Sequence, residues 1–136
     1  MTTLTRLLPL VLAVGAAACG NGESPAGPSP VTDAPTLSFI QNMVFNESCT
    51  HHHGEDATSA GLDLTAGQAH SALVNVQSSQ VDLDLVEPND AENSYLIHKL
   101  ENRAGIVGTR MPPDEALSAA VIDDVKAWIN AGARNN

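Results

Sequence analysis

The sequence predicts a small all-α, helical domain with long loops, preceded by an export signal and a flexible tether. Apolar residues recur every three or four positions near both ends of the region 36–136, as expected for helices that bury one face. Glycine and proline interrupt this region, most densely over 102–116, which favours loops there. The chain of 136 residues is short enough to hold one domain only.

The first segment, 1–19, has the layout of a secretory signal. Arg6 is its one charge, an apolar run follows, and small residues lead to Cys19. A cysteine placed directly after small residues resembles a bacterial lipobox, which implies that cleavage leaves Cys19 as a lipidated N-terminus. The alternative is an ordinary signal peptide cut near Ala18. Both interpretations predict export to the periplasmic side of the cell envelope. In the first the protein is lipid-anchored to a membrane, and in the second it is secreted.

The next segment, 20–35, is rich in Gly, Pro and Ser and has few apolar residues to bury, so it is expected to be a flexible linker. With a lipid on Cys19, the domain over 36–136 would be held near a membrane by its anchor only.

The chain is strongly acidic. Six Lys and Arg against sixteen Asp and Glu give a net charge of −10, and removal of Arg6 with the signal leaves five against sixteen, or −11. Such a charge argues against binding to nucleic acid, which needs a basic surface. It favours partner proteins with a basic docking surface, attracted by electrostatic steering.

The first half of the domain is expected to hold two helices. Leu37, Ile40 and Val44 share one face of a helix over Thr36–Phe45. A second helix is expected over Ala66–Val74, where Thr65 is a suitable N-cap.

The second half begins with a short extended piece within Val76–Val86, which Pro88 ends. Two helices follow. One covers Ser94–Leu100, and the last begins after Ser118 as N-cap and stops at Gly132.

Two motifs carry the chemistry. The sequence FNESCTHHHG at 45–54 follows the first predicted helix, and GTRMP at 108–112 precedes the last. Together they resemble the class I cytochrome c pattern, in which C-x-x-C-H follows the first helix and a Met-Pro loop precedes the last. Further similar segments occur in the same order: GLDL at 61–64, ALVNV at 72–76, NSYLIHKLE at 93–101 and LSAAVIDDVKAWINAGA at 117–133.

The resemblance implies a bound haem and assigns roles in haem binding to individual residues. Cys49 matches the first thioether cysteine, His53 the proximal iron ligand and Met111 the distal iron ligand. His52 stands where the family has its second cysteine, which is a departure from the pattern. Three outcomes follow from it: haem c held by a single thioether, non-covalent haem, or a domain that has lost haem and serves only as an interaction module. His98 is a reserve iron ligand, although a histidine bonded to the main chain is the simpler interpretation.

A second interpretation needs no haem. Cys49, His52 and His53 stand at positions i, i+3 and i+4, so one helical turn would bring a thiolate and two imidazoles together for copper or zinc. Met111 as a fourth ligand would favour copper, because a thioether is a soft donor. The sequence thus predicts an electron-transfer protein with one haem, or else an exported metal-binding module, and not an enzyme.

Overall fold

A computed structural model describes residues 33–136 of the chain. The predicted signal peptide 1–19, its predicted lipidation residue Cys19 and nearly all of the predicted linker 20–35 lie outside the described residues. Among residues 33–136, no helix is both long enough and apolar enough to cross a membrane.

The first helical segment runs from Leu37 to Ser48 without a break. It consists of α1 (Leu37–Ile40), the π-helical η1 (Gln41–Phe45) and α2 (Asn46–Ser48). Thr36 caps its start, since its hydroxyl accepts from the main-chain N–H of Phe39 at 3.1 Å. The helix therefore extends three residues beyond the predicted end at Phe45.

A small hairpin begins at His53, the last residue of the histidine run, in a segment for which no strand was predicted. Strand β1 (His53–Gly54) pairs antiparallel with β2 (Ala57–Thr58), so that His53 lies opposite Thr58. A single 3₁₀ turn, η2 (Ser59–Gly61), then leads away from it.

The remaining helices are α3 (Ala69–Leu73), α4 (Tyr95–Glu101) and α5 (Ala119–Asn130). The predicted cap of the last helix is present, because the Ser118 hydroxyl accepts from the Val121 N–H at 3.4 Å. Between α3 and α4 the chain forms two isolated bridges, Val74 with Val86 and Gln77 with Asp84, within the stretch predicted to be partly extended.

The prediction of an all-α fold class is wrong. The described helices are short, the longest having 12 residues, and a β-hairpin is present beside them. Long stretches such as 102–118 contain neither helix nor strand. The loop over 102–116 was expected, so the departure lies in the hairpin and in the second predicted helix. That helix, predicted over Ala66–Val74, is shortened to α3, because Gly67 adopts positive φ and the helix begins only after it.

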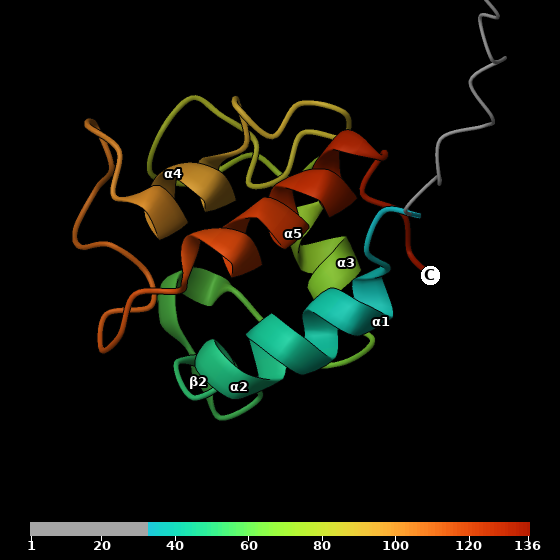
Figure 1. Cartoon of the computed structure of the whole chain (residues 1–136). Helices are drawn as coiled ribbons and strands as arrows, with labels where there is room; N and C mark the ends of the chain where they lie inside the picture. Colours follow the sequence, from blue (N-terminus) through green and yellow to red (C-terminus); the bar gives the residue numbers. More distant parts are fainter. Residues whose placement is uncertain (1–32) are drawn as a thin grey trace, which may run out of the picture. The chain divides into compact units, whose positions relative to one another are not determined.

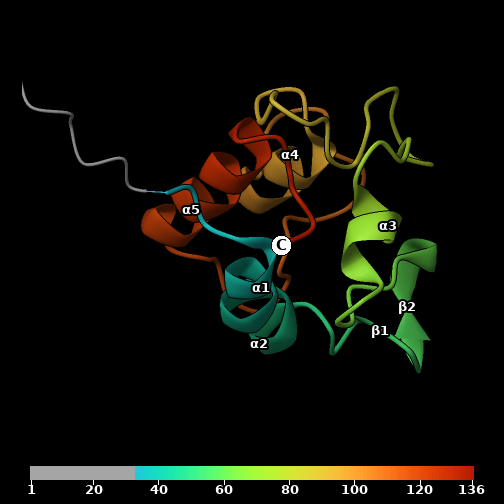
Figure 2. The same ribbon diagram turned by 90° about the vertical axis from the view of Figure 1, so that its right-hand side faces the viewer.

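The core forms where α5 meets α1 and α4, which lie on different sides of it (Figures 1 and 2). Val125, Trp128 and Ile129 of α5 are almost fully buried, and the Trp128 indole N–H donates to the Arg134 carbonyl at 3.0 Å. The chain ends beside α1, where the Asn136 side chain accepts from the Leu37 N–H at 3.0 Å. In this way α5 packs against α4, which lines the cavity described below, and against α1, which begins the helical segment that leads to Cys49.

We expect Trp128→Ala to destabilise the domain by about 3–5 kcal/mol, because it removes the largest buried side chain and leaves a void. Denaturant unfolding measures the loss. Phe39→Ala is the matched control: this aromatic side chain is 41% exposed, and its removal should cost about 0.5 kcal/mol or less. Equal losses in the two variants would contradict the assignment of the core.

A cluster of charged side chains joins α4 to α5 and makes the stability of the fold depend on pH. Glu101 pairs with Lys126 and Arg103, and the hydrogen bond from Lys126 is the main cause that lowers the pKa of the Glu101 carboxyl. A lowered pKa means that this carboxylate stabilises the fold above its pKa in the unfolded chain. That contribution disappears as the pH falls through its pKa in the folded protein.

We therefore expect Glu101→Gln to lower the stability at neutral pH by up to about 1 kcal/mol, with a smaller difference in acid. Urea unfolding at several pH values measures it. Asp123→Asn, on the exposed side of α5 and outside any described ion pair, is the control. A difference between wild type and Glu101→Gln that does not depend on pH would contradict the prediction.

Candidate functional site

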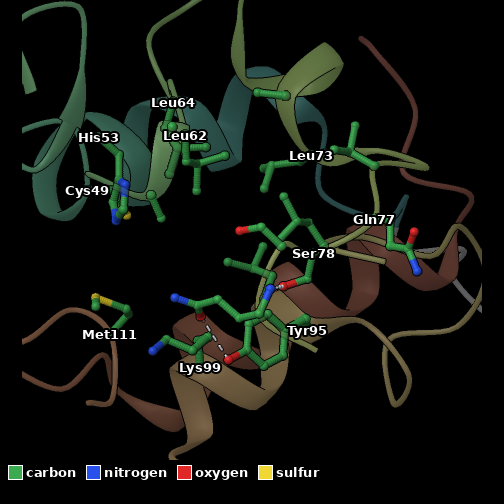
Figure 3. A pocket seen from close by; sticks show the side chains of 18 of the residues that line it. Cys49, His53, Leu62, Leu64, Leu73, Gln77, Ser78, Tyr95, Lys99 and Met111 are labelled. Atoms are coloured by element: carbon green, nitrogen blue, oxygen red, sulfur yellow. Dashed lines mark hydrogen bonds between the residues drawn. The ribbon is translucent and has the colours of Figure 1, made fainter. Parts of the chain in front are cut away.

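A mainly apolar cavity of about 250 Å³ lies between the segment after α2, the segment after α3, and α4 (Figure 3). Its apolar wall is formed by leucines from several elements: Leu62, Leu64, Leu73, Leu85, Leu96 and Leu100. Cys49, His53 and Met111 also line it. Three of the residues singled out in the sequence therefore meet at one cavity.

Cys49 and His53 reach the cavity from one tight turn. The Cys49 N–H donates to Phe45 O at 2.9 Å and the His53 N–H donates to Cys49 O at 2.9 Å, so the helical spacing continues past Ser48. Residues four apart in such a turn share a face. Figure 3 accordingly shows the two side chains next to one another.

The Cys49 side chain is a protonated thiol. Burial raises its pKa to about 11, and its Sγ lies 3.7 Å from the Val44 carbonyl oxygen as a weak donor. Few thiolates exist at neutral pH under these conditions, so the sulfur is a poor nucleophile and a poor metal ligand in this state.

The His53 ring is bonded to the main chain through Nδ1. Its Nδ1 lies 2.9 Å from the Ser59 carbonyl oxygen. A carbonyl only accepts, so Nδ1 is the donor and the lone pair of the neutral ring is on Nε2. Burial, the largest cause, lowers the pKa of this imidazole and favours the neutral form. A neutral histidine whose second nitrogen bonds a main-chain carbonyl has the arrangement of a metal-ligating histidine.

Met111 approaches the cavity from the opposite side. Figure 3 shows its side chain across the space from Cys49 and His53. Its main-chain N–H donates to Lys99 O at 2.9 Å, which ties this loop residue to α4. The thioether is therefore presented to the same cavity as the imidazole.

The other two predicted residues lie elsewhere. His52 is exposed, with Nε2 3.4 Å from Asp114 Oδ2, and it does not line the cavity. His98 donates from Nε2 to the Glu92 carbonyl at 2.8 Å and also lies outside the cavity lining. The structure thus separates His52 and His98 from Cys49, His53 and Met111.

The expected three-ligand site for copper or zinc is not assembled. Within residues 33–136, no three His, Cys, Asp or Glu side chains are grouped closely enough to hold a metal ion. The helical spacing ends at His53, and the His52 side chain is directed to Asp114, 62 positions further along the chain.

Two lining residues on α4 were not singled out from the sequence. The Tyr95 hydroxyl donates to Gln80 Oε1 at 3.1 Å, and Lys99 donates from Nζ to the carbonyls of Val107 and Thr109. Burial lowers the pKa of Lys99. Both lie in a segment that the sequence marked only as a helix, and their partners are too distant in sequence for a local pattern to show them.

Arg110, beside Met111 in the chain, has a hydrogen-bond donor without an acceptor. Its Nη1 is buried without a hydrogen-bond partner among the described residues, although the side chain does not line the cavity. A buried guanidinium nitrogen without an acceptor is unfavourable. An anionic acceptor at this place would stabilise the loop that carries Met111.

Comparison with protein-family profiles, with curated proteins and with solved structures finds no match to this chain. The resemblance to class I cytochromes c stays a prediction based on the sequence motifs.

Gly54, which follows His53, predicts a sensitive position. A Cβ at this residue would lie 2.6 Å from the main-chain oxygen of Thr50, so Gly54→Ala must displace the turn that carries Cys49 and His53. We expect a loss of stability of about 1–3 kcal/mol in thermal unfolding. Ser59→Ala, which keeps the carbonyl that accepts from His53, is the control. An unchanged midpoint for Gly54→Ala would show that the turn is looser than described.

Proposed function

We propose that this protein binds one haem and transfers single electrons in the cell envelope, with His53 and Met111 as axial ligands and Cys49 as the only thioether attachment. One observation carries the proposal: Cys49 and His53 on one side, and Met111 on the other, line the same apolar cavity. His53 and Met111 are 58 positions apart in the sequence, so no local pattern requires them to meet.

The chemistry of the donor set suits a haem. A neutral imidazole and a thioether are the axial pair of many electron-transfer haem proteins, and this pair raises the reduction potential. The hydrogen bond from Nδ1 to Ser59 leaves Nε2 available, and the leucine wall suits an apolar macrocycle. A bound haem would supply reversible one-electron chemistry at this place.

The size of the cavity bears on how a haem could enter it. About 250 Å³ is just below the range of roughly 300–1,000 Å³ that is typical of pockets for drug-sized ligands. Uptake of a haem therefore requires the loop that carries Met111 to move outward. This loop contains no helix or strand, which makes such a movement less costly than the displacement of a packed helix.

Cys49 would form one thioether. Addition of the S–H group across a vinyl double bond of the haem would bond the sulfur to one carbon and place the hydrogen on the other. Because His52 occupies the position of the second cysteine and is directed to Asp114, no second link forms. The raised pKa of Cys49 disfavours the reactive thiolate, so non-covalent haem is the second form to be distinguished by experiment.

The setting follows from the rest of the sequence. An export signal with Cys19 as lipid attachment site would hold the domain on the periplasmic side of the envelope. The net charge of −10, or −11 once Arg6 is removed with the signal, suits a redox partner with a basic docking surface and a weak, salt-sensitive contact. The protein would carry electrons and would not convert a substrate of its own.

The test is expression of the full chain with export and haem maturation, followed by absorption spectroscopy, acid-acetone extraction and intact mass. We expect a Soret band. His53→Ala should abolish haem binding, and Met111→Ala should keep the haem, change its spectrum and lower its potential. Haem that resists extraction and adds its mass indicates the thioether, whereas extracted haem indicates non-covalent binding.

His98→Ala is the matched control and should leave the spectrum unchanged. A spectrum that changes in His98→Ala but not in Met111→Ala would assign the sixth position to His98. A chain without a Soret band would overturn the proposal. Stoichiometric copper or zinc would then indicate a metal-binding module, and no cofactor at all would indicate an interaction domain.

A further inference from the structure

We propose that Tyr95 and Lys99 of α4 are positioning residues that hold the segment from Val107 to Met111 against the cavity, and so set Met111 as the sixth ligand. This inference rests on the proposed function for the identity of the ligand. The hydrogen bonds by which Tyr95 and Lys99 hold this segment, called the clamp below, join residues that the structure describes.

Lys99 contacts the segment at three alternate residues. Its Nζ donates to the carbonyl oxygens of Val107 at 2.8 Å and Thr109 at 2.6 Å. Its main-chain oxygen accepts from the Met111 N–H at 2.9 Å. No described carboxylate pairs with Lys99, unlike Lys126, which pairs with Glu92 and Glu101. The ammonium group is therefore committed to the loop.

Tyr95 supplies a fourth contact from the same face of α4, one turn earlier. Its hydroxyl accepts from the Val107 N–H at 3.0 Å and donates to the Gln80 side chain at 3.1 Å. The ring is buried, with 3% of its surface exposed. Tyr95 thus links three segments that line or border the cavity.

Tyr95 and Lys99 account for the described main-chain hydrogen bonds of this loop, and a side-chain contact between Asp114 and His52 is described beside them. Over residues 104–117, every described main-chain hydrogen bond goes to Tyr95 or Lys99. The segment has no helix or strand, and Gly105 and Gly108 adopt positive φ, so its conformation is not supported by local structure. Without the Tyr95 hydroxyl and the Lys99 ammonium group, the hydrogen bond from the Met111 N–H to the Lys99 carbonyl would be the one left to this loop's main chain.

The first test uses the haem-loaded full chain. Lys99→Met keeps most of the apolar stem and removes the donors, Tyr95→Phe removes only the hydroxyl, and Lys126→Met is the matched control. The readouts are the ferric sulfur-to-iron absorption band, the reduction potential, and the affinity for added imidazole, which competes with Met111.

We expect Lys99→Met to weaken the sulfur-to-iron band, to lower the potential, and to raise the imidazole affinity by about tenfold. Tyr95→Phe should change all three in the same direction but less, and Lys99→Arg, which keeps donors, should restore part of the band. Lys126→Met should leave the three readouts unchanged even if it lowers stability. Met111 ligation that is equal in wild type, Lys99→Met and Tyr95→Phe would overturn the inference.

A second measurement separates this inference from the proposed function. Hydrogen exchange of the full chain without cofactor reports on the amides of Val107 and Met111. We expect Lys99→Met to speed exchange at these amides and Lys126→Met to leave it unchanged. A wild type that takes up no haem, with exchange accelerated in Lys99→Met alone, would overturn the function and keep the clamp. Unchanged exchange in Lys99→Met would overturn the clamp.

Discussion

The burial of the apolar face of α5 is the constraint on which the rest of this domain depends. Val125, Trp128 and Ile129 pack into the core that α5 forms with α1 and α4. The first helical segment leads directly to Cys49 and His53, and α4 holds the loop with Met111. Both sides of the cavity are therefore attached to helices that α5 keeps in place, and loss of this packing would separate the residues proposed to act together.

The cavity combines a rigid side with a loose one. On the rigid side, the turn at Cys49 and the hairpin at His53 fix an imidazole whose Nδ1 already has its hydrogen-bond partner. On the other side, Met111 stands on a segment without helix or strand, whose described main-chain hydrogen bonds go to Tyr95 and Lys99 of α4. This asymmetry suits a site in which a large apolar group enters, because one ligand stays in place while the other moves away and returns.

Parts of this arrangement could be predicted from the sequence. The period of apolar residues and the Ser118 cap located α5 well, and the spacing from Cys49 to His53 placed both on one side of a turn. The all-α fold class was wrong because short helices leave long connections, and nothing in the polar loop after His53 signals a two-residue hairpin. His52 could not be placed either, since its contact with Asp114 joins residues 62 positions apart.

The sequence by itself determined the local features: helix periods, caps, the breaks at glycine and proline, the net charge, and the order of the cysteine, histidine and methionine motifs. These depend on neighbours within a few residues. Only the tertiary structure decided that Cys49, His53 and Met111 line one cavity, that His52 and His98 do not, and that Tyr95 and Lys99 hold the Met111 loop. The physical reason is that these contacts connect side chains to main-chain groups of distant segments, and the packing of α5 brings those segments together.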